Sequence, residues 1–183
     1  RKLVAALACR NQGTRLYGKP MQNLDIEKNL TVLDYMIEWL KDENTIDAIV
    51  LGIAEGVDNL CFIDKANEHG ISHIIGSEED VLARLISCGE KEDATDIFRL
   101  TTESPFTYFE AIPDAWDAHI QGGFDFSCLD YIPDGSGFEI TTMDAYIRSH
   151  KDGERKHRSE LCSLYIRENK EEFTINFIEA PKA

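Results

Sequence analysis

The sequence predicts an α/β fold in which a mostly parallel sheet carries helices on both faces. An unbroken apolar run, Leu3–Cys9, opens the chain and suits a strand that is buried on both faces. Apolar runs and segments of helical periodicity then alternate as far as residue 100. Such alternation is typical of parallel strands joined by crossover helices, which lie on both sides of the sheet.

The helical segments are indicated by apolar residues three or four positions apart and by residues that favour helix ends. Thr31 and Ser77 are expected N-caps, and the acidic residues after Ser77 suit the positive end of a helix. Gly70 is expected to end a helix. Helices are predicted at 31–41, 59–68, 77–89, 109–120, 143–149 and 159–168, strands at 3–9, 46–53, 72–75 and 96–100, and short apolar pieces at 124–128 and 138–141.

Composition narrows the classes of function. The chain has 183 residues, of which 43% are hydrophobic and 29% charged, as in an ordinary globular domain. It contains no apolar run of about 18 residues, so no membrane span is expected. A net charge of −15 argues against nucleic acid as a partner, because phosphate backbones are bound by Lys and Arg. Five scattered cysteines without a C-x-x-C pair favour a reducing, cytoplasmic location.

The basic residues are distributed unevenly. The first 24 residues contain five of the 19 basic residues and no acidic one, although the whole chain has 34 acidic residues. An acidic protein with one basic, glycine-containing corner is expected to bind a small anion there. The five residues are Arg1, Lys2, Arg10, Arg15 and Lys19.

The loop over residues 10–20 is the most informative segment. It follows the first predicted strand, and ligands of open parallel sheets bind at the carboxyl ends of strands. Arg10, Arg15 and Lys19 can neutralise a triphosphate, while Gly13 lets backbone N–H groups approach phosphate oxygens. The loop matches neither G-x-x-x-x-G-K-[ST] nor G-x-G-x-x-G, so neither of those phosphate-binding motifs is predicted.

This loop resembles a signature of the sugar-acid cytidylyltransferases, the family of the KDO, sialic acid and spore coat polysaccharide enzymes. Residues 8–20, ACRNQGTRLYGKP, are similar to A-R-x-x-S-x-R-L-x-G-K-P. Residues 76–84, GSEEDVLAR, are similar to the G-S-E-E-D-V-L-x-R segment of the spore coat group. Residues 99–105, RLTTESP, resemble R-x-T-x-D-x-P, and Pro133-Asp134-Gly135 followed by Glu139 resembles P-D-G-x-D-x-E. The four segments occur in order across nearly the whole chain.

The resemblance implies a three-layer, Rossmann-like nucleotidyltransferase fold of the glycosyltransferase-A type. It implies a single domain over residues 1–183, with a small dimerisation arm near residues 124–149 and a homodimer as the assembly. The activity implied is attack by a sugar-acid hydroxyl on the α-phosphorus of CTP, with release of pyrophosphate and Mg²⁺ as the cofactor. The product would serve the synthesis of surface polysaccharide or glycoconjugate.

The resemblance also assigns roles to individual residues. Arg10, Arg15 and Lys19 would hold the triphosphate and serve as catalytic residues. The other implied nucleotide contacts are Gly13, Thr14, Asp80 and Arg84. The implied metal ligand is Glu103, and the implied substrate contacts are Asp134, Gly135 and Glu139.

The chain departs from the family pattern in three ways. Gln12 and Gly13 replace the usual Gly-Ser, and Tyr17 replaces a proline. Glu103 stands where the family has a metal-binding aspartate. No late T-V-D segment follows Phe173, which we interpret as truncation of a longer protein. Two alternatives therefore stay open: a nucleotidyltransferase with another acceptor, such as a phosphonate, and a non-catalytic relative that binds nucleotide.

Several of the candidate residues also have a purely structural interpretation. Asp80 can cap the helix that follows it, and Arg84 can pair with Asp80 one helical turn away. Glu103 can be a solvated acid at a strand end. Asp134 and Gly135 are also the residue types of an ordinary turn.

Overall fold

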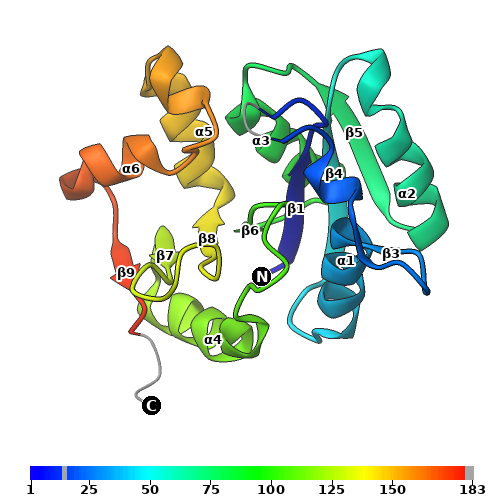
Figure 1. Ribbon diagram of the computed structural model, residues 1–183. Helices are drawn as coiled ribbons and strands as arrows, with labels where there is room; N and C mark the ends of the chain where they lie inside the picture. Colours follow the sequence, from blue (N-terminus) through cyan, green and yellow to red (C-terminus); the bar gives the residue numbers. More distant parts are fainter. Residues whose placement is uncertain (14–15, 180–183) are drawn as a thin grey trace.

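The computed structural model describes residues 1–13 and 16–179. A seven-stranded sheet lies at its centre with helices packed against it (Figure 1). The sheet is formed by β1 (Leu3–Cys9), β4 (Ala48–Ala54), β5 (Ser72–Gly76), β6 (Asp96–Arg99), β7 (Phe126–Cys128), β8 (Glu139–Thr142) and β9 (Ile175–Phe177). The α-helices are α1 (Val32–Asp42), α2 (Cys61–His69), α3 (Val81–Lys91), α4 (Ile112–Gly122), α5 (Met143–Asp152) and α6 (Leu164–Glu168).

Short elements complete the fold. Strands β2 (Asn23–Asp25) and β3 (Leu30–Thr31) form a separate antiparallel ribbon before α1. The 3₁₀ turns are η1 (Lys19–Met21), η2 (Val57–Asn59), η3 (Phe109–Ala111), η4 (Arg155–Arg158) and η5 (Lys170–Glu172).

The strand order is β5-β4-β1-β6-β8-β7-β9. Strands β5, β4, β1 and β6 are mutually parallel. Strand β8 runs antiparallel to both β6 and β7, and β9 is parallel to β7. The sheet is therefore mostly parallel, as predicted, with β8 reversed. The chain adds β4 and β5 on one side of β1 and then returns to its other side with β6, which opens a crevice between β1 and β6.

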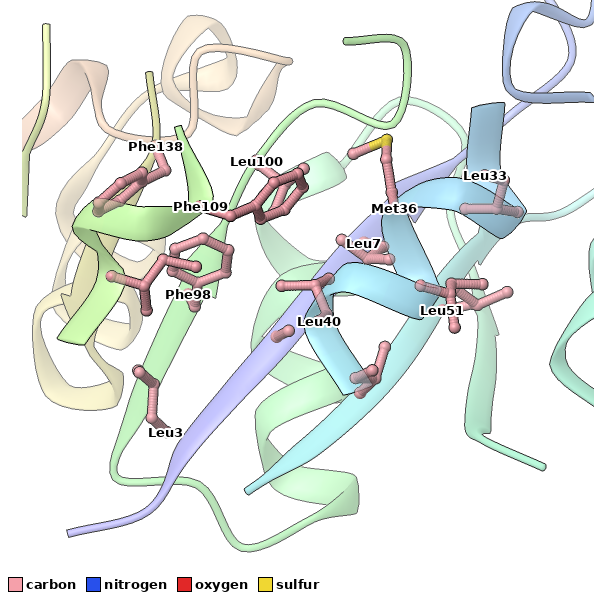
Figure 2. Close-up of a cluster of buried hydrophobic side chains, with 14 of the residues drawn as sticks. Leu3, Leu7, Leu33, Met36, Leu40, Leu51, Phe98, Leu100, Phe109 and Phe138 are labelled. Atoms are coloured by element: carbon pink, nitrogen blue, oxygen red, sulfur yellow. The ribbon is translucent and has the colours of Figure 1, made fainter. Parts of the chain in front are cut away.

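Alternation along β1 separates the two faces of the sheet. Leu3, Ala5 and Leu7 belong to a buried cluster with side chains of α1, α2 and α4. Figure 2 shows Leu3 and Leu7 on β1 among the side chains of this cluster, which include Met36 and Leu40 of α1. Because side chains alternate across a strand, residues between them must face the other way.

The opposite face packs against α3 and α5. Val4 and Ala6 of β1 share a second cluster with Leu82 and Leu85 of α3 and Tyr146 of α5. A third, smaller cluster joins β7 to α5 and α6. The three layers of helix, sheet and helix predicted from the sequence are thus present.

The structure corrects several predicted helix and strand boundaries. Thr31 caps α1 as expected, in a reciprocal capping box with Asp34. Asp80, and not Ser77, caps α3, because the Asp80 carboxylate accepts the hydrogen bond from the Ala83 amide. The helix expected at 159–168 begins only at Leu164, and the edge strand β9 was not predicted.

The region expected to form a dimerisation arm is built into the sheet. Within residues 124–149, β7 and β8 pair with each other, and β8 pairs with β6. Helix α5 then packs against α3. The apolar residues of β7 and β8 are buried in this domain, and the role of this region in dimerisation stays a prediction, as does the homodimer.

Within residues 1–13 and 16–179, no helix combines the length and the apolar character needed to cross a bilayer. The five cysteines are free thiols, and all except Cys61 are buried. Burial raises the pKa of the Cys88 thiol to about 12.

Asp34 provides a test of the fold through pH. Its burial favours the neutral acid, but hydrogen bonds from Thr31, His69 and Lys65 outweigh this effect and lower the pKa to about 2. A carboxyl with a lowered folded-state pKa stabilises the fold above its unfolded pKa of 3.8, and this stabilisation is lost as pH falls towards 2. Asp34→Asn is therefore expected to lower the free energy of unfolding by about 2 kcal/mol at pH 7 and by about half as much at pH 3.

Urea denaturation of both proteins at the two pH values measures this difference. Asp144→Asn is a matched control, because Asp144 is exposed and makes only a helix-surface pair with Arg148. An equal loss at pH 7 and pH 3 for Asp34→Asn would show that its ionisation does not stabilise the fold.

Candidate functional site

A cleft of about 600 Å³ lies at the carboxyl ends of the central strands. Its walls come from the loop after β1, the start of α3, residues 100–104 after β6, and the loop between β7 and β8. This position is the crevice between β1 and β6, where ligands bind in open parallel sheets. The volume lies within the range of small-molecule sites.

The loop after β1 is held in place by buried polar contacts. The Asn11 amide donates to Asn59 Oδ1 at 2.8 Å, and the Gly18 amide donates to the Asn11 carbonyl at 2.8 Å. These bonds close the loop and bring both of its ends to the sheet edge. Arg10 at one end and Lys19 at the other consequently both line the cleft.

Each of these two cations contacts a carboxylate of the same chain. Arg10 pairs with Glu160, in the segment between η4 and α6. Lys19 Nζ lies 3.0 Å from Glu103 Oε2. Both pairs are partly exposed, so they are weakly held, and an entering polyanion can compete for the cations.

Arg84 is the unusual cation of the cleft. It is only 2% exposed, and its Nε and Nη1 atoms have no hydrogen-bond partner in the part of the chain that the structure describes. Burial, with the nearby charge of Arg10, lowers the pKa of its guanidinium. An unpaired buried cation is costly, so this side chain is set up to receive an anion from the cleft that it lines.

A glycine makes room for Arg84. A Cβ atom at Gly76 would lie 2.9 Å from Arg84 Cγ, which is closer than Cβ contacts occur. Gly76 ends β5, so the Arg84 stem crosses directly over the strand end. Packing against the Arg84 side chain therefore explains why residue 76 is a glycine.

Asp80 has a structural role instead of a place in the cleft. It caps α3, and its Oδ2 lies 2.8 Å from His150 Nε2 and 3.9 Å from Arg158 Nη1. It does not pair with Arg84, and it is not among the residues that line the cleft in the described chain. Its contact with a nucleotide stays a prediction.

Glu103, the predicted metal ligand, lies in the cleft after the end of β6. Its side chain is 39% exposed and lines the cleft beside Lys19. The described residues contain no group of three or more His, Cys, Asp or Glu side chains arranged around a metal position. Mg²⁺ commonly takes only one or two carboxylates and completes its shell with phosphate oxygens and water, so Glu103 alone fits that chemistry.

The predicted substrate contacts lie together on the cleft wall that is formed by the loop between β7 and β8 and by the start of β8. Asp134, Gly135 and Glu139 all line the cleft. Gly135 has φ +85°, a conformation that favours glycine, and this turn brings it against Ser104. Asp134 and Gly135 can therefore form a turn and also contact a substrate in the cleft.

Glu139 is held in a buried ion network. It accepts hydrogen bonds from Arg99 Nη1 at 3.0 Å, Ser163 Oγ at 2.6 Å and Arg167 Nη2 at 3.0 Å. Its burial opposes ionisation, but Arg99 and these hydrogen bonds prevail and lower its pKa. Glu139 thus joins β8 to α6 and positions Arg99 at the cleft, so it is a structural residue of the wall.

Glu139→Gln is expected to destabilise the protein by about 2–3 kcal/mol, because the charged hydrogen bonds to both arginines are lost in a buried place. Urea denaturation at pH 7 measures this loss. A change below about 0.5 kcal/mol, as for surface sites, would contradict the buried network.

Two sequence candidates cannot be placed. Thr14 and Arg15 lie outside the described residues. Gly13 is described but is not among the residues that line the cleft. Their predicted nucleotide contacts stay predictions.

A second polar cluster has catalytic residue types but no access to substrate. His119 Nδ1 lies 2.8 Å from Ser127 Oγ, and His119 Nε2 lies 3.1 Å from Asp96 Oδ1. All three side chains are fully buried, and Arg1 also pairs with Asp96. A nucleophile needs an approach for its substrate, so this cluster is interpreted as a packed hydrogen-bond network.

Sequence reasoning missed four residues that shape the cleft. Asn11 anchors the basic loop, Glu160 holds Arg10, and Arg99 joins the wall through Glu139. Asp130 binds Arg167 through both carboxylate oxygens, at 2.6 and 3.1 Å. The partners of all four residues lie at least 37 positions away in sequence, so no local pattern indicated these contacts.

No family model matches the chain. It is 25% identical over 181 residues to an uncharacterized protein of Methanocaldococcus jannaschii, covering 99% of this chain and 73% of that protein. It is 26% identical over 181 residues to the spore coat polysaccharide biosynthesis protein SpsF of Bacillus subtilis, covering 96% of this chain and 74% of SpsF.

Solved structures of other proteins share the fold. A cytidylyltransferase from Leptospira borgpetersenii superposes with a TM-score of 0.85 at 21% identity, over 99% of this chain and 76% of that one. The CMP:2-keto-3-deoxy-manno-octonic acid synthetase complexed with CTP superposes with a TM-score of 0.74 at 12% identity, over 98% of this chain and 90% of that one. The predicted nucleotidyltransferase-like fold is thereby confirmed.

Proposed function

We propose that this chain, which is sugar-acid cytidylyltransferase-like in sequence and fold, transfers CMP from CTP to a sugar acid or a similar acidic acceptor. The acceptor hydroxyl attacks the α-phosphorus and loses its proton. A bond forms between its oxygen and that phosphorus, the bond to the β-phosphate oxygen breaks, and pyrophosphate leaves. The similarity to SpsF, a spore coat polysaccharide biosynthesis protein, supports a role in polysaccharide synthesis.

One observation carries the proposal. Arg84 is buried beside the cleft with two nitrogen atoms that have no partner in the described residues. A purely structural arginine at such a place is expected to be paired, because an uncompensated buried charge is costly. A phosphate group would supply the missing partner.

Arg10 and Lys19 complete the phosphate site. When the triphosphate enters, they exchange Glu160 and Glu103 for phosphate oxygens. Positioning and charge neutralisation are the main contributions that a protein makes to phosphoryl transfer. Arg15 and Thr14, on the same loop, would add a further charge and a hydroxyl donor.

Glu103 would hold the Mg²⁺ ion. When bound, Mg²⁺ offsets the charge on the reacting phosphates. This chain contributes the Glu103 carboxylate, which pairs with Lys19. When this ion pair separates, Lys19 becomes available to the phosphates and Glu103 becomes available to the metal.

The acceptor would enter along the wall formed by Asp134 and Gly135. Glu139 supports this wall through Arg99 and does not itself contact the acceptor in this proposal. We further propose that the protein acts in the cytoplasm, which suits its five free thiols, and that it is a homodimer.

Thermal stability with CTP, UTP, ATP and GTP, each with and without Mg²⁺, tests the proposal. A ligand at about 100 times its Kd should add about 2.7 kcal/mol of stability. Stabilisation by CTP that Mg²⁺ strengthens, followed by pyrophosphate release with a sugar acid, is the expected result. A CTP response without turnover on any sugar acid or phosphonate would favour a non-catalytic relative, and no response to any nucleotide would overturn the proposal.

A further inference from the structure

A second cavity, of about 510 Å³, lies on the far side of the cleft wall. We call it the aromatic pocket, because Tyr35, Trp39, Phe106, Tyr108 and Tyr131 line it. It has no role in the phosphate chemistry proposed above, since no Lys or Arg residue is among its lining residues in the described chain. Its composition is that of a site for an uncharged ligand.

The aromatic side chains of this pocket are unusually exposed. Phe106 is 79% exposed and Tyr131 is 75% exposed. Trp39 stacks on Phe109 with ring centroids 5.4 Å apart and ring planes 1° from parallel, and one part of the indole stays open to the pocket. Several large aromatic side chains gathered at one exposed place indicate a surface that is covered in function.

The aromatic pocket and the cleft share a wall. Ile132 and Pro133 line both cavities. The loop after β6 contributes Ser104 to the cleft and Phe106 to the pocket. The Tyr108 amide donates to the Ser136 carbonyl at 2.9 Å, which fastens this loop to the loop between β7 and β8. A molecule longer than one sugar can therefore contact both sides of the same wall.

We propose that the aromatic pocket binds an uncharged sugar ring of the acceptor, next to the part that carries the attacking hydroxyl. This inference rests on the proposed function and narrows its substrate class to acceptors with at least one further ring. It makes the acceptor an amphipathic molecule with an acidic end in the cleft and an uncharged end in the pocket.

The chemistry of the lining favours a sugar ring over an alkyl chain. Glu110 and Ser136 line the pocket among the aromatic side chains, and their polar groups can bond ring hydroxyls. The apolar faces of a pyranose can lie on Trp39 and Tyr131, whose flat rings offer large contact areas at small entropic cost. An alkyl chain could form no hydrogen bond with these two side chains.

The test uses maltose, cellobiose and N-acetylglucosamine as probes in saturation-transfer-difference NMR with the intact chain. Transfer to sugar ring protons is expected for the unaltered protein with at least one probe. The double variant Phe106→Ala/Tyr131→Ala is expected to reduce this transfer at least five-fold. Both side chains are largely exposed, so the variant should fold, and its CTP-induced thermal shift should be unchanged.

Val57→Ala is the matched control, because Val57 is 83% exposed and does not line either cavity. Absence of transfer from all three sugars would overturn the inference, as would transfer that the double variant leaves intact. Sedimentation that shows self-association through Phe106 and Tyr131 would overturn it in favour of an interface between two copies. A missing CTP response in the unaltered protein would instead count against the proposed function.

Discussion

Arg84→Met is expected to stabilise the ligand-free protein and to remove most of its affinity for CTP. The two effects have one cause, because the guanidinium is buried without partners for Nε and Nη1 in the described residues. Methionine has a similar length and no charge to bury, so the free energy of unfolding should rise by about 1–3 kcal/mol. Loss of one preorganised phosphate donor should weaken binding or turnover about 100- to 1,000-fold.

Urea denaturation measures the first effect, and the CTP-induced shift in Tm measures the second. Arg155→Met is a matched control, because the Arg155 side chain is 88% exposed and pairs with Glu79 at the surface. Both quantities should be almost unchanged in this control. A less stable Arg84→Met protein that binds CTP normally would show that Arg84 is a structural arginine.

The elements of the first half of the fold could be predicted because local pattern and tertiary role agree there. The apolar run of β1 is buried on both faces in the structure, and Thr31 both caps α1 and lies directly before its apolar positions. Ser77 and Asp80 were both possible N-caps of α3, and the spacing of the apolar residues does not distinguish between them. Asp80 is the cap because its carboxylate also meets His150 of α5, which is a tertiary contact.

The C-terminal part was harder to predict because its elements are defined by distant partners. Strand β9 has three residues and pairs with β7, about fifty positions away, so its own sequence carries little signal. Strand β8 is reversed relative to its neighbours, which no local pattern indicates. The place of residues 124–149 in the sheet could not be predicted for the same reason, since only the pairing of β8 with β6 shows that this region completes the sheet.

Sequence reasoning could indicate which candidate residues share one cleft where those residues follow strand ends. Arg10 comes shortly after β1 and Glu103 shortly after β6. Because these strands are parallel, both residues lie at the same edge of the sheet. The pairing of the cleft cations with Glu160 and Glu103 could not be predicted. Glu160 reaches Arg10 across 150 positions of sequence, and only the folded chain brings them together.

Glu103 variants are expected to separate metal binding from phosphate binding. In the structure Glu103 holds Lys19 at 3.0 Å, so removal of its charge frees the lysine for the triphosphate. Glu103→Gln should therefore leave CTP binding without Mg²⁺ unchanged or slightly tighter. The same variant should lower Mg²⁺-dependent turnover about 100-fold or more, because a neutral amide is a poor ligand for a hard cation.

Glu103→Asp is the matched variant, since it keeps the charge and shortens the side chain by one methylene. It should retain Mg²⁺-dependent pyrophosphate release, whereas the glutamine variant should not regain it at saturating Mg²⁺. CTP titrations with and without Mg²⁺ in both variants measure the two steps independently. Equal turnover in all three proteins would mean that the carboxylate serves only as the partner of Lys19 and that the metal, if it is used, is held by other residues.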